Sequence, residues 1–291
     1  MPSRVHDLLV VGNGPAGVGA AVQAGICGLT VLVVGEGRTG GRLALARRVE
    51  NFPGPSAGRN PSGRKICRRL ENWLASRKVP VSSDFISRVD HAEGLFRARG
   101  RKGGSYNSKA VIIATGVRPR HWKAPRGTDD GMRVAANWRE VPTRRGLLVA
   151  VIGGGEAAFD QACSLAERGI GVMILMRGAK PRAYPGLAVE ASKLGVRVYG
   201  NVPVESVARG PDGGALLSCG GRKFRCDYLL PAVGHRPLPP GMSNAARARR
   251  GRGLWLAGDV REPLCRQAAV AFGDGVRSAM LAWEFLRKGR G

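Results

Sequence analysis

The chain has 291 residues and a hydrophobic content of 43%, enough for one large or two average domains with full cores. Lysine and arginine number 47 against 21 acidic residues, so a net charge of +26 attracts acidic partners, including nucleic acid, acidic electron carriers and cofactor phosphates. The sequence contains neither an apolar run of about 18 residues nor a signal-peptide pattern, which argues against a membrane span and predicts a cytoplasmic protein.

The six cysteines and four histidines are widely spread. No Cys-x-x-Cys occurs, so we predict no metal site. The basic residues are also scattered, apart from short clusters at Arg64–Arg69 and Ala246–Arg252, and no nucleic-acid recognition motif accompanies them. An arginine-rich proteome explains the charge more simply, and nucleic-acid binding is not expected as the main function.

The first element is a βαβ unit. Apolar residues 8–11 lead into Gly12, Gly14 and Gly17, a segment compatible with a helix follows, and a second apolar run leads to Glu36. The glycines permit a tight turn, close approach of a pyrophosphate and close packing of helix on strand. The helix amino-terminus supplies N–H groups to the phosphates, and the acid can accept hydrogen bonds from ribose hydroxyls. We therefore predict a dinucleotide site.

The next segments connect this unit to the middle of the chain. Residues 37–54 are rich in turn formers and predict a loop that lines a ligand. Residues 61–78 predict an amphipathic helix with a solvated basic face. Short runs at 85–89 and 95–98 predict strands of a meander, and the apolar strand at 111–116 ends in small residues.

The pattern restarts at Leu147 with a second apolar strand. A Gly-x-Gly-x-x-Ala turn follows at Gly153, Gly155 and Ala158, and then a helix that reaches Glu167. Two glycine-rich turns of this kind predict two dinucleotides bound by one chain.

The second unit ends in basic residues instead of an acid. After a strand at 171–176 come Arg177, Lys180 and Arg182. A basic residue at this place suits a ribose 2′-phosphate, which favours NADPH over NADH, although Arg177 is also consistent with one more surface arginine.

The last part of the chain predicts further strands and one long helix. Short strands are expected between 196 and 230, followed by a basic, alanine-rich loop at 243–252. An apolar strand then ends at Asp259, and residues 266–287 have the pattern of a helix.

Together these blocks resemble the low-molecular-weight thioredoxin reductase family of flavoproteins. The matching segments, in the family's order, are 12–17, 36–43, 50–54, 114–116, 153–158, 232–237, 257–260 and 266–269. The resemblance implies an α/β protein with two Rossmann-like dinucleotide-binding domains of the three-layer ββα type. It implies an NAD(P)-binding domain at 117–231, inserted into a discontinuous FAD-binding domain at 1–116 and 232–291, and a homodimer.

The resemblance also implies which residues bind each cofactor. Those for the adenosine diphosphate of FAD are Gly12, Gly14, Pro15, Ala16, Gly17 and Glu36. Those for the rest of FAD are Gly41, Arg42, Leu43, Asn51, Ala114, Thr115, Gly116, Gly258, Asp259, Arg266, Gln267 and Ala268. Among them Asn51 is expected near the isoalloxazine, Asp259 at the ribityl chain and Arg266–Ala268 at the pyrimidine edge. Those for the nicotinamide nucleotide are Gly153, Gly155, Glu156, Ala158, Arg177 and Arg182.

The sequence departs from the family where the family's chemistry takes place. The redox-active Cys-x-x-Cys of thioredoxin reductases corresponds to residues 136–139, which read Ala-Asn-Trp-Arg. Thiol exchange needs one attacking and one resolving thiol, so no catalytic residue is assigned and thioredoxin reduction by that route is not expected. Cys163 lies out of register, and Cys265, expected near the flavin, is more simply an incidental loop cysteine than a partner in a mixed disulfide.

Two smaller departures concern the cofactors. Arg42 stands where the family usually has glutamine near the flavin, and the change could alter the flavin potential. Met176 and Gly178 replace residues of the basic nucleotide-phosphate motif, which weakens the case for NADPH.

The leading hypothesis is an FAD-dependent NAD(P)H oxidoreductase that passes electrons from flavin to an external acceptor, such as an acidic ferredoxin or a partner's disulfide. The thioredoxin-reductase-like ferredoxin reductases carry a carboxy-terminal extension without counterpart here, so the acceptor stays open. The alternatives are a reductase fed by ferredoxin, and a non-catalytic FAD-binding scaffold or redox sensor.

Overall fold

The computed structural model describes residues 4–54, 61–122, 132–210 and 213–289. Its internal contacts divide the chain into two units, Met1–Arg118 with Pro237–Gly291, and Pro119–Arg236. We describe each unit by itself. Within the described residues, no helix is long and apolar enough to cross a membrane.

The first unit is built on a sheet with the strand order β16-β4-β5-β6-β1-β2-β3, and β17 pairs with β6. The strands are β1 (Val5–Val11), β2 (Val31–Val34), β3 (Val81–Ser82), β4 (Ile86–Ala92), β5 (Leu95–Gly100), β6 (Ser105–Ile113), β16 (Gly241–Met242) and β17 (Leu254–Leu256). β6 runs parallel to β1 and β17, whereas its first half pairs antiparallel with β5. This long strand therefore belongs to both the parallel sheet and the β4-β5 meander.

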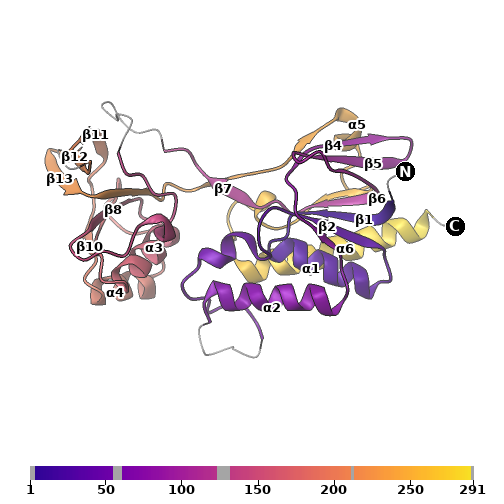
Figure 1. Cartoon of the computed structure of the whole chain (residues 1–291), viewed down its shortest axis with the longest axis horizontal. Coiled ribbons are helices and arrows are strands. Elements are labelled where there is room, and N and C mark those ends of the chain that lie inside the picture. Colours follow the sequence, from indigo (N-terminus) through magenta and orange to yellow (C-terminus); the bar gives the residue numbers. More distant parts are fainter. Residues whose placement is uncertain (1–3, 55–60, 123–131, 211–212, 290–291) are drawn as a thin grey trace. The chain divides into compact units, whose positions relative to one another are not determined.

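Three helices cover one face of the parallel strands (Figure 1): α1 (Pro15–Ile26), α2 (Gly63–Ser76) and α6 (Ala268–Lys288). They share a core with Leu8 and Val10 of β1. On the opposite face, Leu9 and Val11 pack with Phe96 of the meander. Since neighbouring residues of a strand point to opposite faces, the apolar run of β1 supplies both cores. This is the three-layer ββα arrangement that the resemblance implies.

The second unit repeats the layers on a parallel sheet of order β10-β9-β8-β14. Its parallel strands are β8 (Leu148–Ile152), β9 (Gly171–Leu175), β10 (Arg197–Tyr199) and β14 (Tyr228–Pro231). Helices α3 (Glu156–Ala166) and α4 (Pro185–Lys193) contribute to one core. An antiparallel sheet of β11 (Val204–Arg209), β12 (Ala215–Cys219) and β13 (Arg222–Cys226) shares the second core with β8 and β9. Two strands, β7 (Val117–Pro119) and β15 (His235–Pro237), pair with each other at the junctions of the two units.

Most expected elements form, but three segments differ. Residues 243–252 are not simply a loop: Ser243 accepts a hydrogen bond from the Ala246 N–H (3.2 Å) and caps a short helix, α5 (Asn244–Ala248). The expected loop after Glu36 contains a 3-10 turn, η1 (Gly41–Leu45). The sequence analysis predicted no element between Arg182 and Val196, where the structure has the helix α4 with Pro185 in its first turn, a position that suits proline.

Candidate functional site

The first glycine-rich turn forms a cradle between β1 and α1. Gly12 has φ 112°, and a Cβ there would collide with the Ala114 carbonyl. A Cβ on Gly17 would collide with the Gly12 carbonyl. Gly14, by contrast, faces open space, with no atom within 4 Å of an added Cβ. Two glycines therefore allow the close packing and the third leaves room for a ligand.

The cradle has the chemistry of an anion site. Gly14 is the N-cap of α1, no side chain caps the helix, and Pro15 occupies its first turn, which contains no acid. The first-turn N–H groups and the helix dipole can therefore serve a diphosphate. Beside the cradle, the buried hydroxyl of Thr115 has no hydrogen-bond partner within the described residues. These features fit FAD.

Glu36 follows β2 at the edge of this cradle. β2 pairs in parallel with β1, and Asn13 donates a hydrogen bond from Nδ2 to the Gly37 carbonyl (3.2 Å). A Cβ on Gly35 would lie 2.8 Å from the Asn13 backbone nitrogen. This close packing holds the exposed Glu36 next to the glycine-rich turn, where a ribose would lie.

The predicted flavin-end residues come from three distant segments. Asn51 donates a hydrogen bond from Nδ2 to Gln267 Oε1 at 3.1 Å. Gly258 begins the 3-10 turn η3 (Gly258–Val260), where an added Cβ would lie 2.7 Å from the Ala16 Cβ. The structure therefore brings the Gln267 segment to Asn51, and Asp259 to the side of the first cradle.

Charges also meet at the flavin end. Burial raises the pKa of the Asp259 carboxyl, while the guanidinium groups of Arg266 and Arg42 act to lower it. Burial lowers the pKa of Arg42, and Asp259 opposes this shift. An arginine stays protonated at any physiological pH, so Asp259 faces two fixed positive charges. Gly41, Arg42 and Leu43 lie together in η1. Ala114, Thr115 and Gly116 follow the end of β6.

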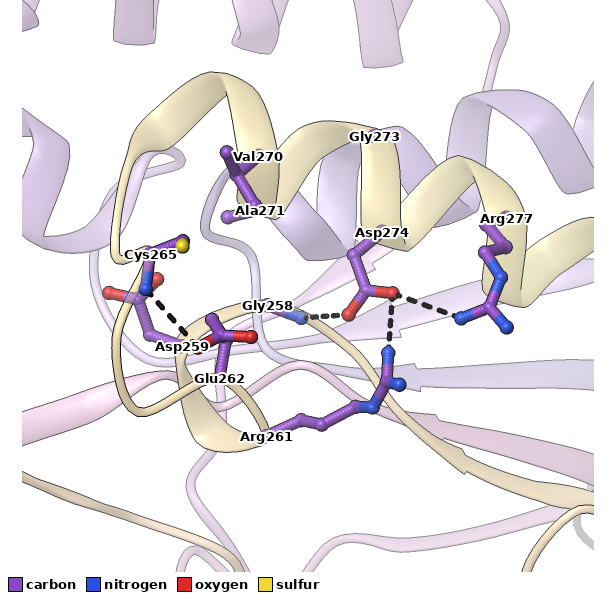
Figure 2. Close-up of a pocket in the computed structure, with 10 residues that line it drawn as sticks. All are labelled: Gly258, Asp259, Arg261, Glu262, Cys265, Val270, Ala271, Gly273, Asp274 and Arg277. Carbon is purple, nitrogen blue, oxygen red and sulfur yellow. Dashed lines mark hydrogen bonds and ion pairs between the residues drawn. The ribbon is translucent and has the colours of Figure 1, made fainter.

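A cleft of about 280 Å³ lies between η3 and the start of α6 (Figure 2). Asp274 accepts a hydrogen bond from the Gly258 N–H (2.9 Å) and forms an ion pair with Arg261 Nη1 (3.0 Å). This carboxylate fixes the turn that carries Asp259. The sequence analysis did not single out Asp274, whose only local signal is an acid between Gly273 and Gly275 inside the predicted helix.

The second cradle lies between β8 and α3. Gly153 has φ 137°, and a Cβ there would collide with the Ala232 carbonyl. Gly155 is the N-cap of α3 and has no atom within 4 Å of an added Cβ, while Ala158 is fully buried. Glu156 in the first turn of α3 is exposed. Space and backbone donors again fit a pyrophosphate.

The segment after β9 contributes a buried methionine and two exposed arginines near the second cradle. Met176 is buried, and its sulfur would lie 2.9 Å from a Cβ on Gly154, so its side chain packs directly against the turn. The Arg182 N–H donates to the Gly154 carbonyl (2.7 Å), which brings the chain back over the cradle. Arg177 and Arg182 are exposed. Two exposed arginines therefore lie in the segment that follows β9, and a backbone hydrogen bond joins Arg182 to the turn.

The sequence profile of one family, described as pyridine nucleotide-disulphide oxidoreductase, matches residues 6–275. The chain belongs to this family. Members of the family are FAD-dependent NAD(P)H oxidoreductases, and the two cradles match that pair of cofactors.

Three relatives illustrate this membership. Thioredoxin reductase of Coxiella burnetii is 28% identical, with 97% of this chain and 96% of that protein covered. Glucosaminate ammonia-lyase of Pseudomonas fluorescens is 27% identical, with 95% and 94% covered. The crystal structure of Lactococcus lactis thioredoxin reductase aligns with a TM-score of 0.83 at 23% identity, covering 97% of this chain and 99% of that one, and shows the shared fold. The relatives thus carry more than one named activity.

In this pyridine nucleotide-disulphide oxidoreductase, residues 136–139 form a capped turn. Asn137 accepts a hydrogen bond from the Arg139 N–H (3.0 Å) at the start of η2 (Trp138–Glu140), and Glu140 accepts one from the Ala136 N–H (2.7 Å). Arg168 donates to the Trp138 carbonyl at 3.0 Å. The turn is stabilised from both sides and contains no sulfur.

None of the six cysteines lies in the capped turn at residues 136–139. Within the described residues all six are free thiols, and no group of His, Cys, Asp and Glu could hold a metal ion. Cys163 is fully buried on α3. Cys265 is exposed in the loop before α6, where its N–H donates to Glu262 (3.2 Å).

Proposed function

We propose that this flavoprotein oxidises NAD(P)H and delivers the electrons from its flavin directly to an external acceptor, without an internal dithiol. The observation that carries the proposal is the combination of two intact dinucleotide cradles with an Ala-Asn-Trp-Arg turn at residues 136–139. The two cradles support both cofactors, whereas the turn at residues 136–139 offers no pair of thiols for exchange.

FAD, when bound, supplies hydride acceptance at N5 and electron delivery to the acceptor. The residues of the chain bind and orient it. The first turn of α1 would hold the pyrophosphate, Glu36 would accept hydrogen bonds from ribose hydroxyls, and Asp259 would accept one from the ribityl chain. The Asn51–Gln267 hydrogen bond (3.1 Å) supports a common position for two segments expected at the ring.

The nicotinamide nucleotide would bind at the second cradle, in the unit Pro119–Arg236, and FAD at the first. The positions of Arg177 and Arg182 support NADPH as the preferred donor, because a guanidinium pairs well with a phosphate dianion. The homodimer that the resemblance implies stays a prediction.

Anaerobic titration of the FAD-loaded protein with NADPH and then NADH tests the function. We expect the flavin absorbance to bleach at a lower NADPH concentration than NADH concentration, and aerobic turnover with benzoquinone but not with thioredoxin. A flavin that stays oxidised in excess of both nucleotides would overturn the proposal and favour a ferredoxin-fed reductase or a non-catalytic scaffold.

The variant Gly155→Asp tests whether the second cradle binds the nucleotide separately from the flavin. Gly155 has φ −93°, open space around it and an N-cap position, so aspartate fits the fold and its carboxylate occupies the place of the pyrophosphate. This variant should keep its flavin and lose at least about tenfold in affinity for both nucleotides.

A further inference from the structure

The outward face of α2 carries an unusual concentration of positive charge. Ile66, Leu70 and Leu74 are each 2% exposed and fix the inward face of the helix. The outward side exposes four cations within its first two turns, here called the basic face: Arg64, Lys65, Arg68 and Arg69. Glu71 is the single acid in α2.

These charges oppose the stability of the helix. Arg64 and Arg68, and likewise Lys65 and Arg69, are four residues apart, the spacing at which like charges repel. Arg64 and Lys65 also lie in the first turn, where the positive end of the helix dipole disfavours cations. Within the described part of the chain, Arg64, Lys65 and Arg68 take part in no ion pair. These charges therefore bring the helix no ion-pair stabilisation, which favours a role at the surface.

The basic face begins beside the flavin end of the first unit. The Gly63 N–H donates to the Ala46 carbonyl (3.0 Å), and a Cβ on Gly63 would collide with the Leu43 carbonyl. Both partners lie in or next to η1, the turn that carries Arg42. Farther along α2, Trp73 stacks on Phe272 with ring centroids 5.7 Å apart. α2 therefore packs against η1 at its start and against α6 farther along.

We propose that the basic face of α2 is the docking surface for a small acidic protein that carries one electron at a time. The inference rests on the proposed function, and it identifies the class of acceptor. Positive potential beside the redox centre would attract such a carrier and orient it towards the flavin. Each NAD(P)H yields a hydride, so two carrier molecules each gain one electron and one proton is released.

Other occupants fit less well. A second copy meeting this face across a two-fold axis would bring like charges together. A nucleic acid would satisfy the charge, but it would draw no benefit from the proximity of η1 and the flavin end, and the sequence contains no recognition motif.

The test compares two triple neutralisations in the FAD-loaded protein. The first is Arg64→Gln, Lys65→Gln and Arg68→Gln on α2. The control is Arg144→Gln, Arg145→Gln and Lys193→Gln, which removes three exposed charges from the other unit. Arg144 and Arg145 precede β8, at the opposite end of that strand from the glycine-rich turn. The probe is an acidic [2Fe–2S] ferredoxin, measured by calorimetric binding and by its NADPH-dependent reduction.

We expect the α2 variant to lose about tenfold in ferredoxin affinity and reduction rate at low ionic strength, and the control to change less than about twofold. High salt should reduce the wild-type rate to that of the α2 variant. Benzoquinone reduction should be unchanged in both, and the α2 variant should melt no lower than wild type because repulsion is relieved.

Equal losses in both variants, or unchanged ferredoxin binding in the α2 variant, would overturn the docking surface. The docking surface would also be overturned if the α2 variant lost binding to a duplex RNA but kept its binding to ferredoxin, because the basic face would then bind a nucleic acid. Failure of the wild type to reduce benzoquinone with NADPH would instead overturn the proposed function, and calorimetric binding would still report on the surface by itself.

Discussion

Arg42 is the residue whose charge would bear most directly on a flavin bound at the proposed site. It lies in η1, where it interacts with Asp259, and its guanidinium stays charged at physiological pH. Beside a flavin at the proposed site, this fixed positive charge would stabilise the extra negative charge of the reduced ring. The glutamine expected from the family would not do so.

Replacing Arg42 with glutamine should therefore lower the flavin reduction potential. We expect a shift of about 30 mV, which corresponds to about 1.4 kcal/mol for two electrons. The measurement is anaerobic dye-coupled titration of the FAD-loaded protein. Arg287→Gln, which removes a charge paired with Glu284 near the end of α6, is the control and should leave the potential unchanged. A potential equal to wild type in the Arg42 variant would show that this charge does not act on the ring.

At the scale of elements, the crossing of α1 and α6 holds the two halves of the first cradle together. A Cβ on Gly275 would collide with the Ala16 carbonyl, and one on Gly19 would collide with the Phe272 carbonyl. Gly273, only two residues away on α6, has no atom within 4 Å of an added Cβ. The two α6 glycines therefore have opposite roles.

The pair Gly275→Ala and Gly273→Ala tests this packing. Gly275→Ala should destabilise the protein by about 1–3 kcal/mol and weaken FAD binding, since the helices must separate beside Ala16. Gly273→Ala should stabilise it by up to about 1 kcal/mol, because alanine favours the helix and meets nothing. Thermal melts with and without FAD measure both effects. The same sign of change in the two variants would argue against close helix packing as the cause.

The crossing of α1 and α6 also explains why the glycine-rich turns could be predicted from the sequence whereas the contacts of α6 could not. The glycine-rich turns are local: strand, turn and helix are contiguous, so their spacing alone predicted both cradles. The roles of Gly275 and Asp274 depend on residues more than two hundred positions earlier or on the Gly258 turn, and no local pattern contains that information. The short helix α5 was not predicted because its five residues are too few to show a helical period, and its alanine-rich, basic composition was interpreted as a loop.

At the scale of the whole molecule, the chain consists of one continuous and one discontinuous unit. Both cores of the second unit are formed by residues between Trp122 and Ala232. The first unit takes residues from both ends of the chain. The sheets and helices of the second unit therefore form their hydrophobic cores from residues of that unit alone.

Excised residues 119–236 should fold alone and bind NADPH. We expect a single cooperative unfolding transition and an NADPH affinity within about threefold of that of the full chain. Adding Arg182→Gln to this fragment should weaken NADPH binding about tenfold and leave NADH binding nearly unchanged. Circular dichroism and calorimetry provide the readouts, and an unstructured fragment would contradict an independent second unit.

The Asn51–Gln267 hydrogen bond joins residues 216 positions apart, and this separation constrains the order of events during synthesis. On the ribosome, the second unit is complete and free to fold while residues after 236 are still being made. The first cradle is synthesised before the second unit, whereas its partners Gly258, Gln267 and α6 are synthesised after it. In the proposed site, FAD would therefore meet its complete set of binding segments only after the second unit has been made, and β6 lacks its β17 partner until then.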